Sequence, residues 1–273
     1  MKRVLGIIGS PRKMGNCELT VKEIAARLPE PAELSMVRLV EKDIRPCKAC
    51  YRCLMGDCPI QDDFGMVLDA IASADGVIVA APVYLLGAHS SLQRFLDRGL
   101  QFWKRLDDLT GKPAVGVALA GVMDGEGASL LGVENFLRAM GMAVKGRAVI
   151  HAALPGEALL SEEGRAAAAR LANALFSQES PPAESPSCTE CGGTYFEFRG
   201  GGRVFCLLCG SGGTVSSDGE GIRLSTKPPA HSWRGPAARK AHGEWLIGMK
   251  EKYLRERERL KEVARGYAGG NFI

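Results

Sequence analysis

Short apolar runs alternate with segments of helical periodicity along most of this chain, from residue 3 to about 177. The runs expected to form strands are rich in β-branched or small apolar residues and lie at 4–8, 33–39, 76–80, 114–119 and 143–150. The expected helices lie at about 16–28, 63–73, 91–106, 128–140 and 161–176. Continuous apolar strands joined by helices are typical of a parallel sheet covered on both faces. We therefore predict an α/β fold with five parallel strands in an open three-layer sandwich.

The composition narrows the class of protein further. The chain has 273 residues, 46% hydrophobic and 24% charged, which excludes a disordered chain, a collagen and a small disulfide scaffold. Its net charge of +4 does not demand a nucleic acid or a membrane as partner. We expect no membrane span and no secretory signal, because the apolar runs are short and the first one leads directly into a glycine turn. Nine cysteines in short-spaced groups favour metal ligation in a reducing compartment, so we expect a cytoplasmic protein.

A glycine-containing loop, residues 9–17, separates the first expected strand from the first expected helix. Backbone N–H groups at such a helix start can bind a phosphate, and serine, asparagine and basic side chains can add to them. The alternative is a plain tight turn. The loop matches neither Gly-x-Gly-x-x-Gly nor the Walker sequence, which disfavours a dinucleotide fold and a kinase. The candidate cofactor-binding residues here are Ser10, Arg12, Met14, Gly15, Asn16 and Cys17.

This loop resembles the phosphate loop of the flavodoxin-like, NADPH-dependent FMN reductase superfamily. Residues 80–87 and the segment Phe95-Leu96-Asp97-Arg98 are similar to two further signatures of that family. The resemblance covers about residues 1–177 and implies a flavodoxin-like domain that binds FMN. It implies that the flavin ring is contacted by Pro82, Val83, Tyr84, Leu85, Gly87 and Gly121. Cys17 stands where the family usually has Thr or Ser, and core packing is the alternative role for Tyr84.

Four cysteines lie close together after the second expected strand, within residues 47–58. Their spacing is C-x2-C-x2-C-x4-C, and they are Cys47, Cys50, Cys53 and Cys58. This compact spacing favours a [4Fe-4S] cluster, with a structural zinc or metal-free cysteines as alternatives. Within the superfamily the arrangement resembles the iron-sulfur flavoproteins. We interpret the carboxylates of Asp62 and Asp63, which follow, as the cap and first turn of a helix.

A second cysteine unit follows a linker that is rich in Pro, Ser and Glu at 178–187. Residues 188–229 contain two C-x2-C-G knuckles, which predict a zinc ribbon with a mononuclear iron as the alternative. Its ligands would be Cys188, Cys191, Cys206 and Cys209. The family resemblance does not extend to this unit. Residues 237–267 predict an amphipathic helix with interleaved charges, which favours docking on a partner subunit or on the flavodoxin-like domain over nucleic-acid binding.

Together these patterns predict an oxidoreductase with FMN, a [4Fe-4S] cluster and zinc. It would transfer electrons between a one-electron, ferredoxin-like carrier and a small acceptor such as oxygen, peroxide or a quinone. The resemblance also implies a homo-oligomer. One alternative is an NAD(P)H-dependent FMN or quinone reductase without a cluster, and another is a zinc-ribbon interaction module on a flavodoxin-like scaffold. The sequence assigns no catalytic residue.

Overall fold

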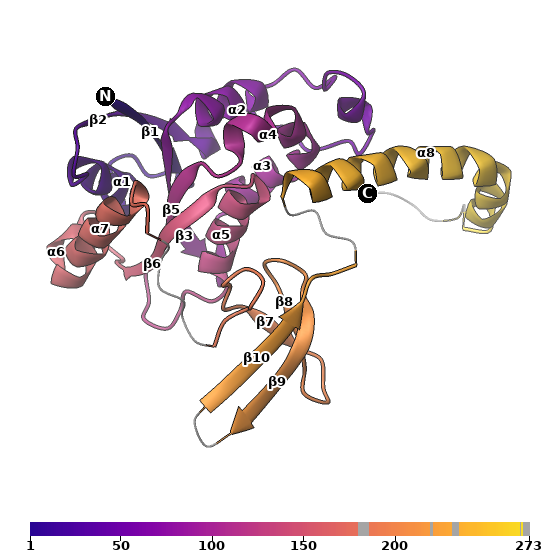
Figure 1. Cartoon of the computed structure of the whole chain (residues 1–273). Helices are drawn as coiled ribbons and strands as arrows, with labels where there is room; N and C mark the ends of the chain where they lie inside the picture. The colour runs from indigo at the N-terminus through magenta and orange to yellow at the C-terminus, as the bar shows by residue number, and fades with distance from the viewer. Residues whose placement is uncertain (180–185, 219–220, 231–234, 268, 270–273) are drawn as a thin grey trace. The chain divides into compact units, whose positions relative to one another are not determined.

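A parallel sheet forms the centre of the fold, with its strands in the order β2-β1-β3-β5-β6 (Figure 1). The strands are β1 (Lys2–Ile8), β2 (Ala32–Arg38), β3 (Gly76–Tyr84), β5 (Pro113–Ala120) and β6 (Ala143–His151). All five predicted strands are confirmed. The three central strands, β1, β3 and β5, are buried along most of their length, as a parallel sheet between two helical layers requires. The computed structural model describes residues 1–179, 186–218, 221–230, 235–267 and 269, in two compact units, Met1–Ala230 and His231–Ile273.

Helices cover both faces of the sheet, which confirms the three-layer architecture (Figure 1). One layer contains α1 (Asn16–Ala26), α6 (Glu157–Leu160) and α7 (Glu162–Leu175). The other contains α2 (Phe64–Ser73), α3 (Ser91–Leu96), α4 (Leu106–Leu109) and α5 (Ser129–Ala139). Alternate side chains of β1 serve the two cores, with Val4 and Ile8 on the α1 side and Leu5 and Ile7 on the α2 side. Gly6 lets α1 pack closely, because a Cβ there would lie 2.4 Å from Val21.

One predicted helix is wrong in its extent. The segment 91–106 was expected to be continuous, but α3 ends at Leu96 and a 3-10 helix, η3, follows at Gly99–Arg105. The break coincides with Arg98, whose side chain turns inward and is 3% exposed. A second feature without a predicted counterpart is β4 (Gly87–Ala88), which pairs back onto the end of β3. Two further 3-10 turns are η1 (Leu39–Glu41) and η2 (Arg52–Leu54).

A small antiparallel sheet follows α7 in the same unit, in the order β10-β9-β8-β7. Its strands are β7 (Phe196–Phe198), β8 (Arg203–Cys206), β9 (Gly212–Asp218) and β10 (Gly221–Lys227). The sheet lies within the predicted ribbon region at 188–229. Most of the predicted linker, residues 180–185, lies outside the described residues.

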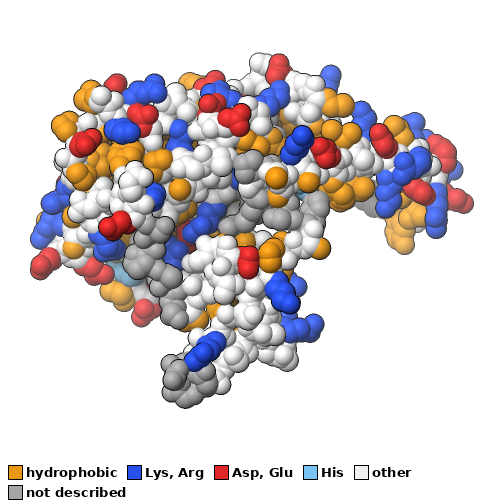
Figure 2. Space-filling view, viewed as in Figure 1, with side chains coloured by type: hydrophobic (Ala, Val, Ile, Leu, Met, Phe, Trp, Pro, Cys, Tyr) orange, Lys and Arg blue, Asp and Glu red, His pale blue; other side chains and the backbone are white. Residues whose placement is uncertain are grey.

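The second unit contains one long helix, α8 (Pro236–Arg265), which corresponds to the helix predicted at 237–267. Basic and acidic side chains are interleaved along it (Figure 2). Among the described residues, no helix has both the length and the apolar character needed to cross a bilayer.

Candidate functional site

Three loops that carry predicted cofactor residues lie at one edge of the sheet. They follow β1, β3 and β5, which are neighbours in the sheet and run in the same direction. The structure therefore brings the predicted phosphate loop at 9–17, the hairpin at 82–88 and the glycine-rich loop at 121–127 to the same carboxyl edge. Ligands of open parallel sheets bind at this edge.

The phosphate loop leads into α1 without a side-chain cap. Gly15 occupies the N-cap position, and the N–H groups of the first helical turn that follows it have no helical acceptor. The loop is tightly folded: a Cβ on Gly15 would lie 2.9 Å from the Cβ of Arg12, and Met14 adopts a left-handed φ of 54°. The 11-residue helix α1 therefore begins without a side-chain cap, directly after a strained loop. Such a helix start fits the phosphate of FMN.

Two residues without a sequence signal hold this loop in place. Arg38, at the end of β2, donates to the carbonyl oxygens of Ser10 and Arg12 at 2.9 and 3.0 Å. It also forms an ion pair with Glu18 at 2.6 Å, and both side chains are 10% exposed. The hydrogen bond from Lys22 is the main factor that lowers the pKa of Glu18 to about 2, with burial opposing it. Glu18 is therefore ionised and fixes two cations beside the loop.

The side chains of Asn16 and Cys17 are engaged within the protein. The Asn16 amide donates to the carbonyl oxygens of Ala152 and Leu154, and its oxygen accepts from the N–H of Gly156 at 2.9 Å. Asn16 therefore ties the loop after β6 to α1, which leaves its backbone N–H for the predicted cofactor contact. Burial raises the pKa of the Cys17 thiol to about 12, against an opposing hydrogen bond with Ser10, so the thiol stays neutral.

The hairpin between β3 and β4 presents apolar side chains to solvent. Its two turn residues, Leu85 and Leu86, both adopt left-handed φ angles of 49° and 63°, which are unfavourable for leucine. Leu85 is fully exposed, and Tyr84, which is half exposed, contacts the His89 ring edge-on at a centroid distance of 5.1 Å. Strained, exposed apolar residues beside the phosphate loop fit a site for the flavin ring.

The neighbouring loops extend this apolar edge. Val122 and Met123, from the loop after β5, and Met14 are all exposed. Gly121, the predicted contact of that loop, opens it directly after β5. In the same loop Glu126 accepts from the His151 ring at 3.4 Å.

The compact cysteine loop lies between β2 and α2, as predicted. Two non-glycine residues within it, Ala49 and Tyr51, have left-handed φ angles of 48° and 55°. The pKa of the Cys53 thiol is raised by burial first and then by the nearby sulfurs of the other three cysteines, so all four lie in one neighbourhood. Among the described residues, the sulfurs of these four cysteines do not form a group close enough to share a single metal ion.

A buried arginine contacts this loop. Arg98 donates to the Cys58 sulfur at 3.5 Å and to the carbonyl oxygen of Arg45 at 3.0 Å. It pairs with Asp62 at 2.6 Å, with both side chains at most 2% exposed. Burial opposes ionisation of Asp62, but the Arg98 interaction and two backbone N–H groups outweigh it and lower its pKa. A cation beside a cysteine sulfur stabilises a thiolate and the negative charge of a thiolate-bound cluster.

The predicted capping role of the two carboxylates is only partly right. Asp63 is the N-cap residue of α2, but its side chain accepts from the N–H of Asp43 and makes no capping bond within the helix. Asp62 accepts from the N–H of Phe64 at 3.2 Å and also forms the buried pair with Arg98. Sequence reasoning missed this pairing, although Arg98 belonged to a recognised segment.

The second cysteine group is assembled as one compact set of four sulfurs. The sulfurs of Cys188, Cys191, Cys206 and Cys209 all lie within 4.8 Å of one another. The Cys188–Cys209 and Cys191–Cys206 sulfur pairs are each 3.6 Å apart. A zinc ion with four sulfurs at about 2.3 Å requires sulfur separations of about 3.8 Å, so these residues fit that ion. The knuckle glycines Gly192 and Gly210 adopt the left-handed φ angles that such turns need.

Comparisons with known proteins agree with this site. The family model described as NADPH-dependent FMN reductase matches residues 2–154. An iron-sulfur flavoprotein of Methanocaldococcus jannaschii is 34% identical over 149 residues, which are 53% of this chain and 76% of that protein. An iron-sulfur flavoprotein of Methanosarcina thermophila is 31% identical over 147 residues, which are 53% of this chain and 77% of that protein.

A solved structure described as a flavone reductase matches 99% of both chains with a TM-score of 0.73 and 18% identity, which supports the fold. The family match covers more than half of the chain and includes all the loops at the carboxyl edge of the sheet. The chain belongs to the NADPH-dependent FMN reductase family, with the iron-sulfur flavoproteins among its relatives, and is an FMN-dependent oxidoreductase.

Proposed function

We propose that this FMN-dependent oxidoreductase transfers electrons between a one-electron, ferredoxin-like carrier and a small acceptor such as oxygen, peroxide or a quinone. Cys47, Cys50, Cys53 and Cys58 would hold a [4Fe-4S] cluster, and the second cysteine group would hold zinc. The observation that carries the proposal is the loop at 47–58, with the buried cation of Arg98 at the Cys58 sulfur. An iron-sulfur cluster exchanges single electrons and FMN one or two, so the pair couples one-electron to two-electron chemistry.

The chain's own residues would bind and shield these groups. The helix start after Gly15 offers N–H donors to the FMN phosphate, and Arg38 keeps the loop in that shape. The hairpin at 82–88 offers the ring an apolar surface that excludes water. Arg98, held in place by its buried ion pair with Asp62, would offer an N–H donor to the cluster's ligand sulfur of Cys58.

Metal and flavin analysis of anaerobically purified protein tests this assignment. We expect flavin, about four irons, four sulfides and one zinc per chain. Two variants serve as reciprocal controls: Cys53→Ser should lose iron and keep zinc, and Cys191→Ser should lose zinc and keep iron. Flavin without iron in the anaerobic protein would contradict the cluster.

A reductase that takes its electrons directly from NAD(P)H is the second candidate, because the family description names NADPH. Anaerobic bleaching of the flavin by NADPH, at a rate unchanged in Cys53→Ser, would favour it. Reduction by a ferredoxin-like donor that is lost in Cys53→Ser would favour the first candidate. The flavone reductase likeness adds an unsaturated aromatic ketone to the acceptors worth testing.

We also propose that the protein works as a homo-oligomer. The exposed apolar side chains of Met14, Tyr84, Leu85, Val122 and Met123 form an edge that a second copy would cover. Light scattering after size exclusion should give a multiple of 29.2 kDa, and a strict monomer at micromolar concentration would contradict this assembly.

A further inference from the structure

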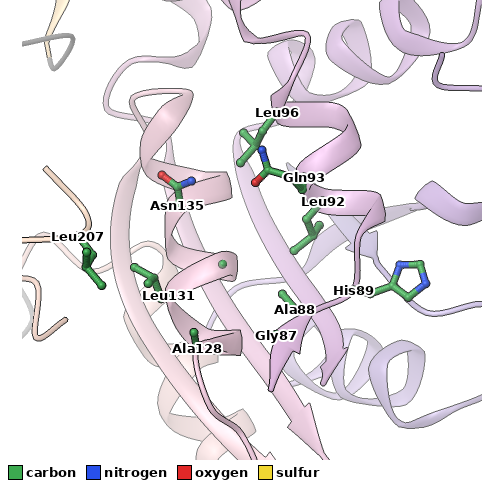
Figure 3. A pocket seen from close by; sticks show the side chains of 11 residues that line it. Gly87, Ala88, His89, Leu92, Gln93, Leu96, Ala128, Leu131, Asn135 and Leu207 are labelled. Atoms are coloured by element: carbon green, nitrogen blue, oxygen red, sulfur yellow. The ribbon is translucent and has the colours of Figure 1, made fainter. Parts of the chain in front are cut away.

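A cavity of about 300 Å³ lies beside the hairpin, between α3, α5 and the second cysteine knuckle (Figure 3). Its lining includes Ala88 of β4, Leu92 and Gln93 of α3, Leu131 and Asn135 of α5, and Leu207 of the knuckle. This volume is at the lower end of the range for small-molecule sites, which are mostly apolar with a few placed polar groups. It is distinct from the phosphate loop, but β4 belongs to the hairpin that we assign to the flavin ring.

The lining has no charged side chain. None of the residues that line the cavity is Asp, Glu, Lys or Arg. His89 lines the cavity, but its ring points away from the space between α3 and α5 (Figure 3). Its Nδ1 lies 3.0 Å from the Ser91 hydroxyl, and burial lowers its pKa, with Arg94 adding to the effect. A phosphate or carboxylate would therefore lose its hydration without gaining a cation, so the cavity suits a neutral ligand.

Two carboxamides supply the polar contacts. The Gln93 amide nitrogen donates to Asp97 at 2.7 Å, and its oxygen accepts no hydrogen bond from the described residues. The half-buried Asn135 side chain has no hydrogen-bond partner in the described part of the chain. Asn135 offers an N–H donor to a ligand carbonyl, while Gln93 offers an acceptor to a ligand hydroxyl.

The cysteine knuckle provides one wall. Leu207 lies between the ligand candidates Cys206 and Cys209, and its N–H donates to the carbonyl oxygen of Tyr195 at 3.0 Å. Leu131 of α5 packs against the buried cysteine group. Arg147 of β6 donates to the Thr194 hydroxyl at 3.4 Å. These contacts hold the knuckle on α5 and place the Leu207 side chain at the cavity.

We propose that this cavity binds a small, neutral, mostly apolar molecule with a carbonyl group, and that the second cysteine group serves the site by holding Leu207 in its wall. That the molecule is an electron acceptor rests on the proposed function, whereas its binding does not. Calorimetric titration of the flavin-loaded protein with chromone, an uncharged two-ring ketone, tests the proposal. Chromone-2-carboxylate is the charged counterpart and should bind at least about tenfold more weakly.

Three variants locate the site. Asn135→Leu keeps the branching at Cγ but removes the donor and should weaken chromone binding about fivefold, as expected for one neutral hydrogen bond. Leu207→Ala should weaken it by a similar factor, and Cys191→Ser should do so by releasing the knuckle. Leu160→Ala, at an exposed position on α6, is the matched control and should bind as the wild type does.

The outcomes separate this proposal from the proposed function. Equal chromone affinity in wild type, Asn135→Leu and Leu207→Ala would overturn the cavity assignment, even with a fully active flavin. Unchanged chromone affinity in a Cys191→Ser variant that has lost its zinc would overturn the role of the second cysteine group. Normal binding with the expected variant effects, in a protein that does not reduce a dye such as ferricyanide from any donor, would support the cavity and contradict the proposed function.

Discussion

Replacing Glu18 by Gln tests how the phosphate loop is held. The carboxylate accepts from Lys22 and from the N–H of Met14 and pairs with Arg38. Its pKa falls from an ordinary 4.5 to about 2, so the charged form contributes about 3 kcal/mol to the free energy of unfolding at neutral pH. A lowered pKa gives stability that is complete above 4.5 and lost as the pH falls toward 2.

Urea unfolding of flavin-free wild type and Glu18→Gln between pH 7 and pH 3 measures this contribution. We expect the wild type to be more stable at pH 7, by up to about 3 kcal/mol, since glutamine can keep part of the hydrogen bonding. The difference should shrink by more than about half by pH 3, because the wild-type carboxylate is then protonated in the unfolded chain. A difference that stays constant over this pH range would refute the argument from charge.

Three further outcomes follow from the same structure. Arg98→Met should lower the free energy of unfolding by about 3 to 5 kcal/mol, because it leaves the Asp62 carboxylate buried and unpaired; urea unfolding of this variant and of the double variant with Asp62→Leu, which should recover part of the loss, measures it. Cys17 should remain unmodified by iodoacetamide at pH 8 in the native protein, because its thiol has a pKa of about 12; rapid alkylation, detected by peptide mass spectrometry, would contradict its burial. Leu85→Gly should stabilise the flavin-free protein by about 1 kcal/mol, because it relieves a left-handed leucine with no buried side chain; thermal unfolding measures it, and a destabilisation would mean that Leu85 is packed in solution.

The periodicity of the chain was sufficient to predict the sheet and its covering helices. Buried parallel strands leave a clear apolar signal, and the loops after them occupy the binding edge in any fold of this type. The positions of the phosphate loop and of the loop after β3 could therefore be predicted, but the pairing with β4 that makes the second loop a hairpin could not. The two cysteine groups were equally visible because their spacing is local. The helix at 91–106 was mispredicted because Arg98 turns inward for a partner outside the helix, and no local pattern reveals that.

The parts of the site that could not be predicted are pairings between residues that lie far apart in the sequence. Arg38 lies 20 residues from Glu18, and Arg98 lies 36 residues from Asp62. Each pair is brought together by the completed sheet, so neither partner carries a signal of its own. Leu207 is a similar case, because its place in a cavity wall depends on how the cysteine knuckle packs against α5.

The surroundings of the two cysteine groups argue for different roles. Cys58 accepts a hydrogen bond from the guanidinium of Arg98, which is also paired with Asp62, so a charge-assisted N–H donor lies at this sulfur. In the second cysteine group, the neutral hydroxyls of Thr226 and Ser211 lie 3.3 and 3.0 Å from the sulfurs of Cys188 and Cys209. A centre that gains and loses electrons benefits from the first environment, whereas an ion of fixed charge is well served by the second. This contrast supports our proposals of a redox role for the loop at 47–58 and of a structural role for the second cysteine group, which would hold Leu207 in the cavity wall.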